Sequence, residues 1–159
     1  MKRYIVTPSR CTACRSCELA CAFRHGSMGL PGKTRIRAYM IAEGRHMPLT
    51  CLQCEEAACV KVCPVGALVR NEQTGAVDVL DAKCIGCEAC MAACPFGAMA
   101  MLAKPDSGPT AYKCDLCIHR PQGPSCIEVC PTKAIYTIDA KVLTDNLRKK
   151  REQAAVAQL

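Results

Sequence analysis

Sixteen of the 159 residues are cysteine, and they fall into four groups of four. We call these groups motif 1 (residues 11–21), motif 2 (51–63), motif 3 (84–94) and motif 4 (114–130). Motif 3 reads C-I-G-C-E-A-C-M-A-A-C-P, with cysteines at two successive three-residue steps and a fourth before proline. In bacterial ferredoxins this spacing lets three thiolates hold one [4Fe–4S] cube while the fourth ligates another. The sequence therefore predicts one iron–sulfur cluster for each group of cysteines.

The other motifs are variants of the same pattern. The second gap is two residues longer in motif 2 and six residues longer in motif 4, while motif 1 has the motif 3 spacing without the proline. All four end in C-x-x-x-C. Motifs 2, 3 and 4 continue into similar tails, C-P-V-G-A-L, C-P-F-G-A-M and C-P-T-K-A-I. This internal repeat indicates one structural unit used several times.

Two other uses of cysteine fit the sequence less well. A secreted disulfide scaffold is disfavoured because the residues before Cys11 contain no apolar segment typical of a signal peptide. A zinc ribbon needs two C-x-x-C pairs, which leaves the third cysteine and the C-x-x-x-C-P step without a role. The long second gap of motif 4 leaves one alternative open, in which that group holds a different centre.

Composition agrees with a core built around inorganic clusters. The chain has no Trp, two Phe and four Tyr, so aromatic side chains are too few to fill its interior. We expect one compact domain in which metal binding supplies much of the folding energy. The formal net charge of +7 is roughly cancelled by four clusters that each carry a charge of about −2. The basic excess is therefore not evidence for a nucleic-acid partner.

Short strands and helical turns are expected between the motifs, which gives an α+β fold. A helical turn over residues 18–23, which includes Cys21, is expected to lead out of the motif 1 loop. Alternation and turn signals predict strands at residues 4–6, 35–41, 47–50, 67–70, 76–80, 99–101, 111–113 and 135–138. The clearest hairpin joins residues 67–70 to 76–80 through a turn at Asn71 to Gly75.

The C-terminal segment differs from the rest. Thr144 is the expected helix cap, and Leu147 to Leu159 contains good helix formers without Gly or Pro. Arg148, Lys149, Lys150 and Arg151 lie beside a modest apolar stripe. The basic face is either a solvated surface or a docking element for a partner. No segment has the ~20 apolar residues of a membrane span, so a cytoplasmic protein is expected.

No other motif competes as chemistry. His25, His46 and His119 lack the spacing of metal-binding or catalytic histidines, and each is expected to be a hydrogen-bonding or surface residue. The sequence contains no dinucleotide-binding glycine motif, phosphate-binding loop or nucleophile elbow. We expect no catalytic residues and no organic cofactor site, so the chemistry of the chain is electron transfer.

These motifs resemble the electron-transfer subunits of oxidoreductases that carry 16 cysteines and four clusters. The resemblance covers residues 3–140 and is most specific in motif 2, in motif 3 with its F-G-A tail, and in K-C-D-L-C-I-H-R from Lys113. Members accompany formate dehydrogenase, dimethyl sulfoxide reductase, hydrogenase, carbon monoxide dehydrogenase and tungsten-dependent aldehyde oxidoreductase. Compared with the membrane-linked members, this sequence lacks a long insertion and a C-terminal anchor, so it is more similar to the small partners of the last two enzymes.

The resemblance implies two interleaved ferredoxin-like units within residues 1–140, one from motifs 1 and 4 and one from motifs 2 and 3, followed by a basic tail at 141–159. It also implies crossed ligation. The four implied ligand sets are cluster 1 with Cys11, Cys14, Cys17 and Cys130, cluster 2 with Cys21, Cys114, Cys117 and Cys126, cluster 3 with Cys51, Cys54, Cys59 and Cys94, and cluster 4 with Cys63, Cys84, Cys87 and Cys90.

The function implied is a relay that passes single electrons between a large catalytic subunit and a flavin or nicotinamide subunit, a ferredoxin or a quinone enzyme. The catalytic subunit would carry a tungsten or molybdenum pterin or a nickel–iron centre, with aldehyde oxidoreductase slightly preferred, and the assembly would be a hetero-oligomer. The alternatives are a free-standing polyferredoxin that diffuses between enzymes and, more remotely, a zinc-stabilised interaction module.

Overall fold

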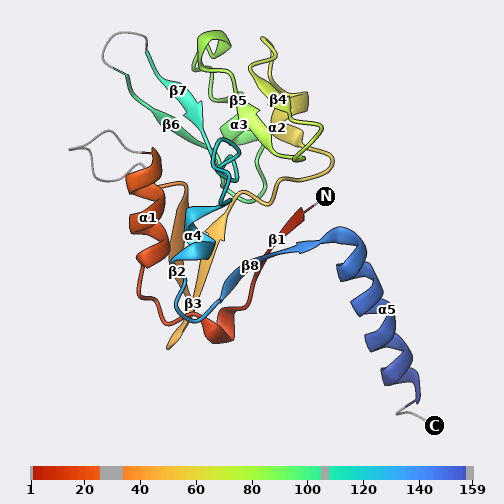
Figure 1. Cartoon of the computed structure of the whole chain (residues 1–159). Coiled ribbons are helices and arrows are strands. Elements are labelled where there is room, and N and C mark those ends of the chain that lie inside the picture. Colours follow the sequence, from red (N-terminus) through yellow and green to blue (C-terminus); the bar gives the residue numbers. More distant parts are fainter. Residues whose placement is uncertain (1, 26–33, 105–107, 157–159) are drawn as a thin grey trace.

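The computed structural model describes residues 2–25, 34–104 and 108–156, and its described residues form an α+β fold of short elements (Figure 1). The strands are β1 (Lys2–Val6), β2 (Ile36–Ala42), β3 (Arg45–Thr50), β4 (Leu68–Arg70), β5 (Val77–Val79), β6 (Ala100–Leu102), β7 (Thr110–Tyr112) and β8 (Ile135–Asp139). The helices are η1 (Pro8–Arg10), α1 (Ser16–His25), α2 (Ala58–Lys61), η2 (Asp81–Lys83), α3 (Ala89–Ala92), α4 (Ser125–Glu128) and α5 (Ala140–Val156). Every strand predicted from the sequence is present, within one or two residues of its expected bounds.

Most strands pair with their neighbour in the chain. Within the described residues, β2 with β3, β4 with β5 and β6 with β7 form antiparallel two-stranded sheets. The β4–β5 hairpin has the predicted turn, in which the Asn71 side-chain oxygen accepts hydrogen bonds from the backbone N–H groups of Gln73 and Thr74, each at 3.0 Å. Such local pairing follows directly from turn chemistry, because an Asn side chain can satisfy the backbone of the residues that follow it.

The remaining sheet joins the two ends of the described chain. Strand β1 runs antiparallel to β8, with Lys2 opposite Asp139 and Val6 opposite Ile135. The pairing extends beyond the strands, since Thr7 N–H donates to the Ala134 carbonyl at 2.8 Å. Motif 1 begins shortly after β1 and motif 4 ends shortly before β8, so this sheet brings the first and last motifs together.

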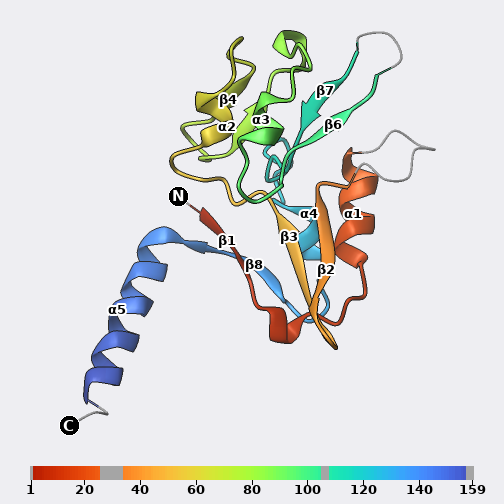
Figure 2. The ribbon, with the colours of Figure 1, turned by 180° about the vertical axis from the view of Figure 1, so that it is seen from behind.

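The described residues form two hydrophobic cores, one around cysteines of motifs 1 and 4 and one around cysteines of motifs 2 and 3. In one part, α1 packs against α4, and the buried residues are Cys17, Cys21, Ile36, Cys126 and Ile135. In the other part, α2 packs against α3, and the buried residues are Ala57, Leu68, Val77, Cys90, Met99 and Ala111. Figure 2 shows the two parts from behind, with α1, α4, β1 and β8 on one side and α2, α3, β4 and β5 on the other.

The C-terminal helix starts earlier than the sequence indicates. Helix α5 begins at Ala140, directly after β8, so Thr144 lies inside its second turn and the predicted cap at Thr144 is wrong. Strand β8 ends at Asp139, whose carboxylate accepts a hydrogen bond from the Lys141 N–H in the first turn of α5 at 2.9 Å. In Figures 1 and 2 the helix projects away from both cores and meets the rest of the molecule at β8. Residues 157–159 of the predicted helix lie outside the described residues.

A search of the described residues finds no helix that is both long and apolar enough to cross a membrane.

Candidate iron–sulfur centres

Every motif contains a left-handed backbone turn just before its second cysteine. The residues at that place are Ala13, Gln53, Gly86 and Leu116, with φ angles of 55°, 52°, 71° and 57°. Only glycine adopts this conformation without strain, so three of the four loops hold a side chain in a costly geometry. Strained backbone of this kind persists where the surrounding structure fixes it, which is typical of ligand-holding loops. In motifs 1 and 3 the two cysteines that flank this turn, Cys11 with Cys14 and Cys84 with Cys87, line the same cavity.

The repeated C-P-x-x-A tails have a shared geometry that explains their sequence. In each tail the sulfur of the cysteine accepts a hydrogen bond from the backbone N–H of the alanine four residues later. The residue before the alanine again has a positive φ, which turns that N–H back toward the sulfur. The three pairs are Cys63 with Ala67 at 3.2 Å, Cys94 with Ala98 at 3.4 Å and Cys130 with Ala134 at 3.3 Å. Hydrogen bonds to the charged thiolate favour it and tune a bound cluster.

Cys21 receives an equivalent bond by a different route. Motif 1 lacks the proline tail, and the Cys21 sulfur accepts a hydrogen bond from the Arg35 N–H, 14 residues further along the chain, at 3.2 Å. Arg35 directly precedes β2, so this strand takes the place of the missing tail. Sequence reasoning missed Arg35 because the contact is not local.

Two of the ligand sets implied by the family resemblance line cavities. One cavity is bordered by Cys11, Cys14, Cys17 and Cys130, together with Pro48, Ile135 and neighbouring residues. A second cavity is bordered by Cys63, Cys84, Cys87 and Cys90, together with Leu68, Met101 and Ala111. In each case three cysteines come from one motif and the fourth from another. Thiolate donors around an otherwise apolar cavity are the environment that iron–sulfur cubes use.

Thiols from the other two implied ligand sets also lie close to one another. Burial raises the pKa of the Cys126 thiol to about 12, and the neighbouring Cys114, Cys21 and Cys117 add to this rise. Burial likewise raises the pKa of Cys59, with further contributions from Cys51 and Cys94. Thiols that oppose each other's ionisation in a buried space need a cation to become thiolates. Iron supplies that positive charge, and cysteine sulfur is a soft ligand that suits it.

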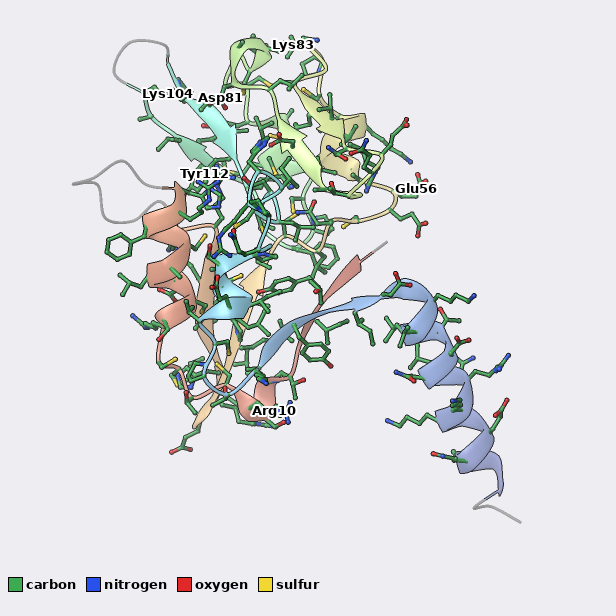
Figure 3. The ribbon with its side chains drawn as sticks, viewed as in Figure 1. Arg10, Glu56, Asp81, Lys83, Lys104 and Tyr112 are labelled. Carbon is green, nitrogen blue, oxygen red and sulfur yellow. The ribbon has the colours of Figure 1, made fainter. Side chains whose placement is uncertain are left out.

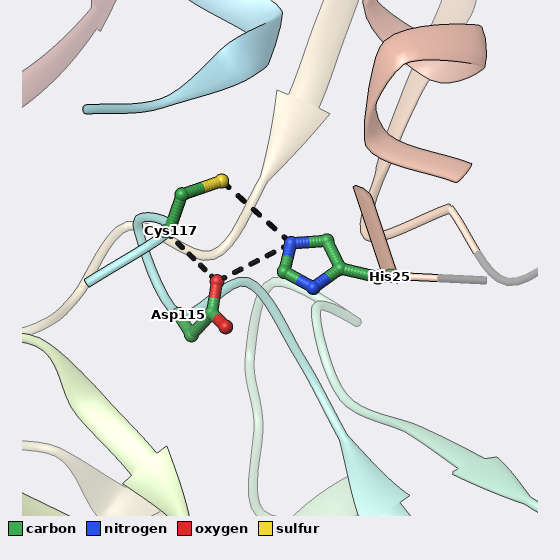
Figure 4. A group of neighbouring side chains, drawn as sticks. All are labelled: His25, Asp115 and Cys117. Atoms are coloured by element: carbon green, nitrogen blue, oxygen red, sulfur yellow. Dashed lines mark hydrogen bonds and ion pairs between the residues drawn. The ribbon is translucent and has the colours of Figure 1, made fainter. Parts of the chain in front are cut away.

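His25 lies beside motif 4 in a small polar group (Figure 4). Its Nε2 atom is 3.4 Å from Asp115 Oδ1 and 3.7 Å from Cys117 Sγ, while the Cys117 N–H donates to the same Asp115 oxygen at 2.9 Å. The other Asp115 oxygen is held by Arg35 at 2.8 Å. Burial lowers the pKa of His25, and the Asp115 charge opposes that shift.

These three residues are close enough to hold a metal ion, since their ligand atoms lie within 4.8 Å of one another. However, Cys117 is an expected cluster ligand, and the Asp115 carboxylate is already paired with Arg35. The group is therefore better described as hydrogen-bonding support for the Cys117 loop. Tyr4 plays a similar part on β1, where its hydroxyl lies 3.6 Å from Cys126 Sγ.

Comparison with known proteins identifies the family. Models described as 4Fe-4S dicluster domain match residues 42–140 and residues 10–68. The chain belongs to the 4Fe-4S dicluster family. None of its 16 cysteines forms a disulfide, and the two matching domains together span the four motifs. The chain holds four [4Fe–4S] clusters.

Curated relatives match over almost the whole chain. The electron transport protein HydN of Escherichia coli (strain K12) is 37% identical over 98% of this chain and 99% of its own length. From the same strain, the putative electron transport protein YsaA is 41% identical over 94% of this chain and 99% of its own length. Formate hydrogenlyase subunit 2 is 34% identical over 96% of this chain and 89% of its own length. Among solved structures, a chain of the active-site complex of benzoyl coenzyme A reductase aligns with 24% identity, a TM-score of 0.48 and 99% and 95% coverage, which is too distant to support a conclusion.

Proposed function

We propose that this chain relays single electrons through four clusters between a catalytic oxidoreductase subunit and a second redox partner. The observation that carries this proposal is the pair of cysteine-lined cavities in a dicluster-family chain whose relatives HydN and YsaA, matched over almost their whole length, are named an electron transport protein and a putative one. The chain is an electron-transfer protein and not an enzyme on its own. Its clusters supply the one-electron chemistry, and its residues hold, shield and tune them.

Crossed ligation belongs to the same proposal. The cavity linings favour the sets of clusters 1 and 4, and the mutual influence of buried thiols favours those of clusters 2 and 3. The sets are also close to each other. Cys59 of cluster 3 packs on the core that contains Cys90 of cluster 4, and Cys17 of cluster 1 packs in one core with Cys21 and Cys126 of cluster 2. These contacts support two pairs of neighbouring clusters, one in each part of the molecule.

The comparisons favour a formate- or hydrogen-linked catalytic partner. One relative is named formate hydrogenlyase subunit 2, and another is a probable iron–sulfur subunit encoded in the Frd operon of Proteus vulgaris. The relatives named here do not support the preference for aldehyde oxidoreductase that the family resemblance implied. We therefore propose a hetero-oligomer in which the catalytic subunit acts on formate or hydrogen and a ferredoxin, flavin or quinone enzyme completes the circuit.

The first test is cluster content. Protein prepared without oxygen should contain about 16 iron and about 16 sulfide per chain, because each cube has four of each. Zinc in place of iron, or half of the expected iron after careful reconstitution, would contradict the four-cluster assignment.

The second test concerns the partner. Purified from its native host without oxygen, the chain should co-elute with a larger subunit, and formate or hydrogen should then reduce its clusters, as seen in their visible absorbance. The isolated chain should be reduced by dithionite but should not oxidise either substrate with a dye acceptor. Purification without any large subunit would favour the free-standing polyferredoxin, and substrate turnover by the isolated chain would exclude a relay role.

A further inference from the structure

Lys113 is a buried lysine at the boundary between the two parts of the molecule. It follows β7 and directly precedes Cys114, the first cysteine of motif 4. Its residue exposure is 3%, which is rare for lysine because an ammonium group loses strong hydration when it is buried. Such a residue needs both hydrogen-bond partners and a compensating charge.

The partners are three oxygen atoms that carry no charge. The Lys113 ammonium donates to the carbonyl of Val77, to the carbonyl of Cys114 at 2.7 Å and to the side-chain oxygen of Gln53 at 3.2 Å. An ammonium group has three N–H donors and no acceptor, so three acceptors satisfy it completely. The geometry therefore fits a protonated lysine, but its neighbours do not neutralise it.

Gln53 extends this contact into motif 2. Gln53 is 5% exposed and lies between Cys51 and Cys54. Its side-chain nitrogen donates to the Cys114 carbonyl at 2.7 Å, and its oxygen accepts from the Val77 N–H at 2.9 Å as well as from Lys113. Lys113 and Gln53 thus tie the first loop of motif 2 to the first loop of motif 4.

The compensating charge comes from the two cysteine loops that Lys113 joins. Its ammonium donates to the carbonyl of Cys114, an expected ligand of cluster 2, and to Gln53, which lies between Cys51 and Cys54, expected ligands of cluster 3. The thiolates of a loaded cluster on each loop would supply the negative charge that the uncharged oxygen partners lack.

We propose that Lys113 is a buried positive charge that sets the reduction potentials of clusters 2 and 3, whose first ligand loops it joins. Each one-electron reduction adds a negative charge to a cluster, and a fixed cation nearby in a poorly hydrated interior stabilises the reduced form. Lys113 thereby makes both clusters easier to reduce where electrons cross between the two parts of the molecule. This inference rests on the proposed four-cluster relay.

The internal repeat offers a matched control. Lys83 directly precedes Cys84 in motif 3, as Lys113 precedes Cys114 in motif 4, but the Lys83 side chain is exposed. Figure 3 places Lys83 at the outer edge of the part that contains β4 and β5. Water and salt screen an exposed charge, so its effect on a cluster should be much smaller.

The experiment is a potentiometric titration of the anaerobic, cluster-loaded protein, followed by electron paramagnetic resonance. In Lys113→Met, two of the four clusters should become about tenfold harder to reduce at a fixed potential, a shift of about −59 mV for a one-electron couple. Lys113→Arg keeps the positive charge, so the reduction potentials of these two clusters should stay close to those of the wild-type protein. Lys83→Met should shift the potential of every cluster by less than Lys113→Met shifts those two. Four unchanged potentials, or an equal shift of all four, would overturn the proposal.

Gln53→Glu is the second variant, in case Lys113→Met does not assemble its clusters. It places a negative charge beside the same ammonium and should lower the potentials of the same two clusters. Failure of both variants to bind iron would make Lys113 a purely structural residue and would reject the electrostatic role. The proposed function is judged separately, because wild-type protein with zinc or little iron would reject the relay itself, whereas full iron content with unmoved potentials rejects only the role of Lys113.

Discussion

At the scale of single residues, the cluster loops depend on backbone conformations that most side chains disfavour. Gly86, before the second cysteine of motif 3, combines a φ of +71° with a close approach to another segment. A Cβ atom at this position would lie 2.6 Å from the Pro109 carbonyl oxygen and 2.9 Å from Pro109 Cγ. Gly97 also has a positive φ, of +58°, but a Cβ there would meet nothing within 4 Å.

The two glycines predict a difference in stability. Gly97→Ala should cost only the left-handed strain, about 1–2 kcal/mol. Gly86→Ala should lower the free energy of unfolding by about 2 kcal/mol more, because the Pro109 backbone must also move. Its thermal unfolding midpoint should therefore be about 4–8 °C lower than that of Gly97→Ala. The loss of iron–sulfur absorbance on heating without oxygen measures the thermal midpoints of both variants. Equal midpoints for the two variants would mean that Pro109 moves away from the new methyl group without a measurable loss of stability.

The same loops show what the sequence could and could not reveal. The glycine at position 86 predicts a turn. The equivalent positions in the other motifs are Ala13, Gln53 and Leu116, whose residue types do not predict the positive φ that they have. The cysteine spacing predicts clusters because it reflects the chemistry of the ligands. It does not predict the strain that the loops must accept.

Crossed ligation makes a prediction about Cys21. In Cys21→Ala the exposed thiols should be those of motif 4, because Cys21 is buried among them and interacts electrostatically with Cys117. Alkylation followed by mass spectrometry should label Cys114, Cys117 and Cys126 rapidly. The other three cysteines of motif 1 should stay protected. Cys17→Ala serves as the control and should expose Cys11, Cys14 and Cys130 instead. Labelling of motif 1 alone in Cys21→Ala would show that its four cysteines share one cluster.

At the scale of elements, local and distant pairings differ in how well the sequence predicts them. The hairpins at β2–β3 and β4–β5 follow from alternation and from turns such as Asn71 to Gly75. The β1–β8 pairing joins residues more than 120 positions apart, and no local signal specifies it. The packing of α1 on α4 also joins residues far apart in the sequence, so the sequence supports it only through the resemblance to known subunits.

The two cores predict separate losses of clusters. Ile135, 2% exposed, packs with Cys17, Cys21 and Cys126, and Val77, 1% exposed, packs with Cys90 and its neighbours. Ile135→Ala should cost about 2–5 kcal/mol and first release the cysteines of clusters 1 and 2. Val77→Ala should first release those of clusters 3 and 4.

Alkylation during partial unfolding measures which cysteines open first. Val69→Ala, at the more exposed Val69 on the neighbouring strand β4, provides the control and should leave all the clusters protected. If Ile135→Ala and Val77→Ala open all 16 cysteines together, the two cores form one cooperative unit and the separate-loss prediction is wrong.

At the scale of the whole molecule, α5 is the element least explained by the clusters. It packs on β8, and its side chains from Asn146 to Ala154 are exposed. An isolated helix of this length is only marginally stable in water, and it gains most from a partner that covers one face. The helix carries Arg148, Lys149, Lys150 and Arg151 in succession, with Glu152 in contact with Arg148 at 3.6 Å.

These charges predict a salt-dependent role in docking a larger subunit. Replacing the four basic residues by Gln should leave iron content and reduction potentials unchanged, because helix α5, which carries them, projects away from both cores in Figures 1 and 2. Affinity for the native catalytic subunit should fall by about tenfold at low ionic strength, and the difference should largely disappear near ~0.5 M salt, where exposed charges are screened. Lys61→Gln, a change at an exposed lysine paired with Glu56 in the other part of the molecule, is the control and should have little effect. An affinity that the four-residue change leaves intact at every salt concentration would identify the basic face as a solvated surface.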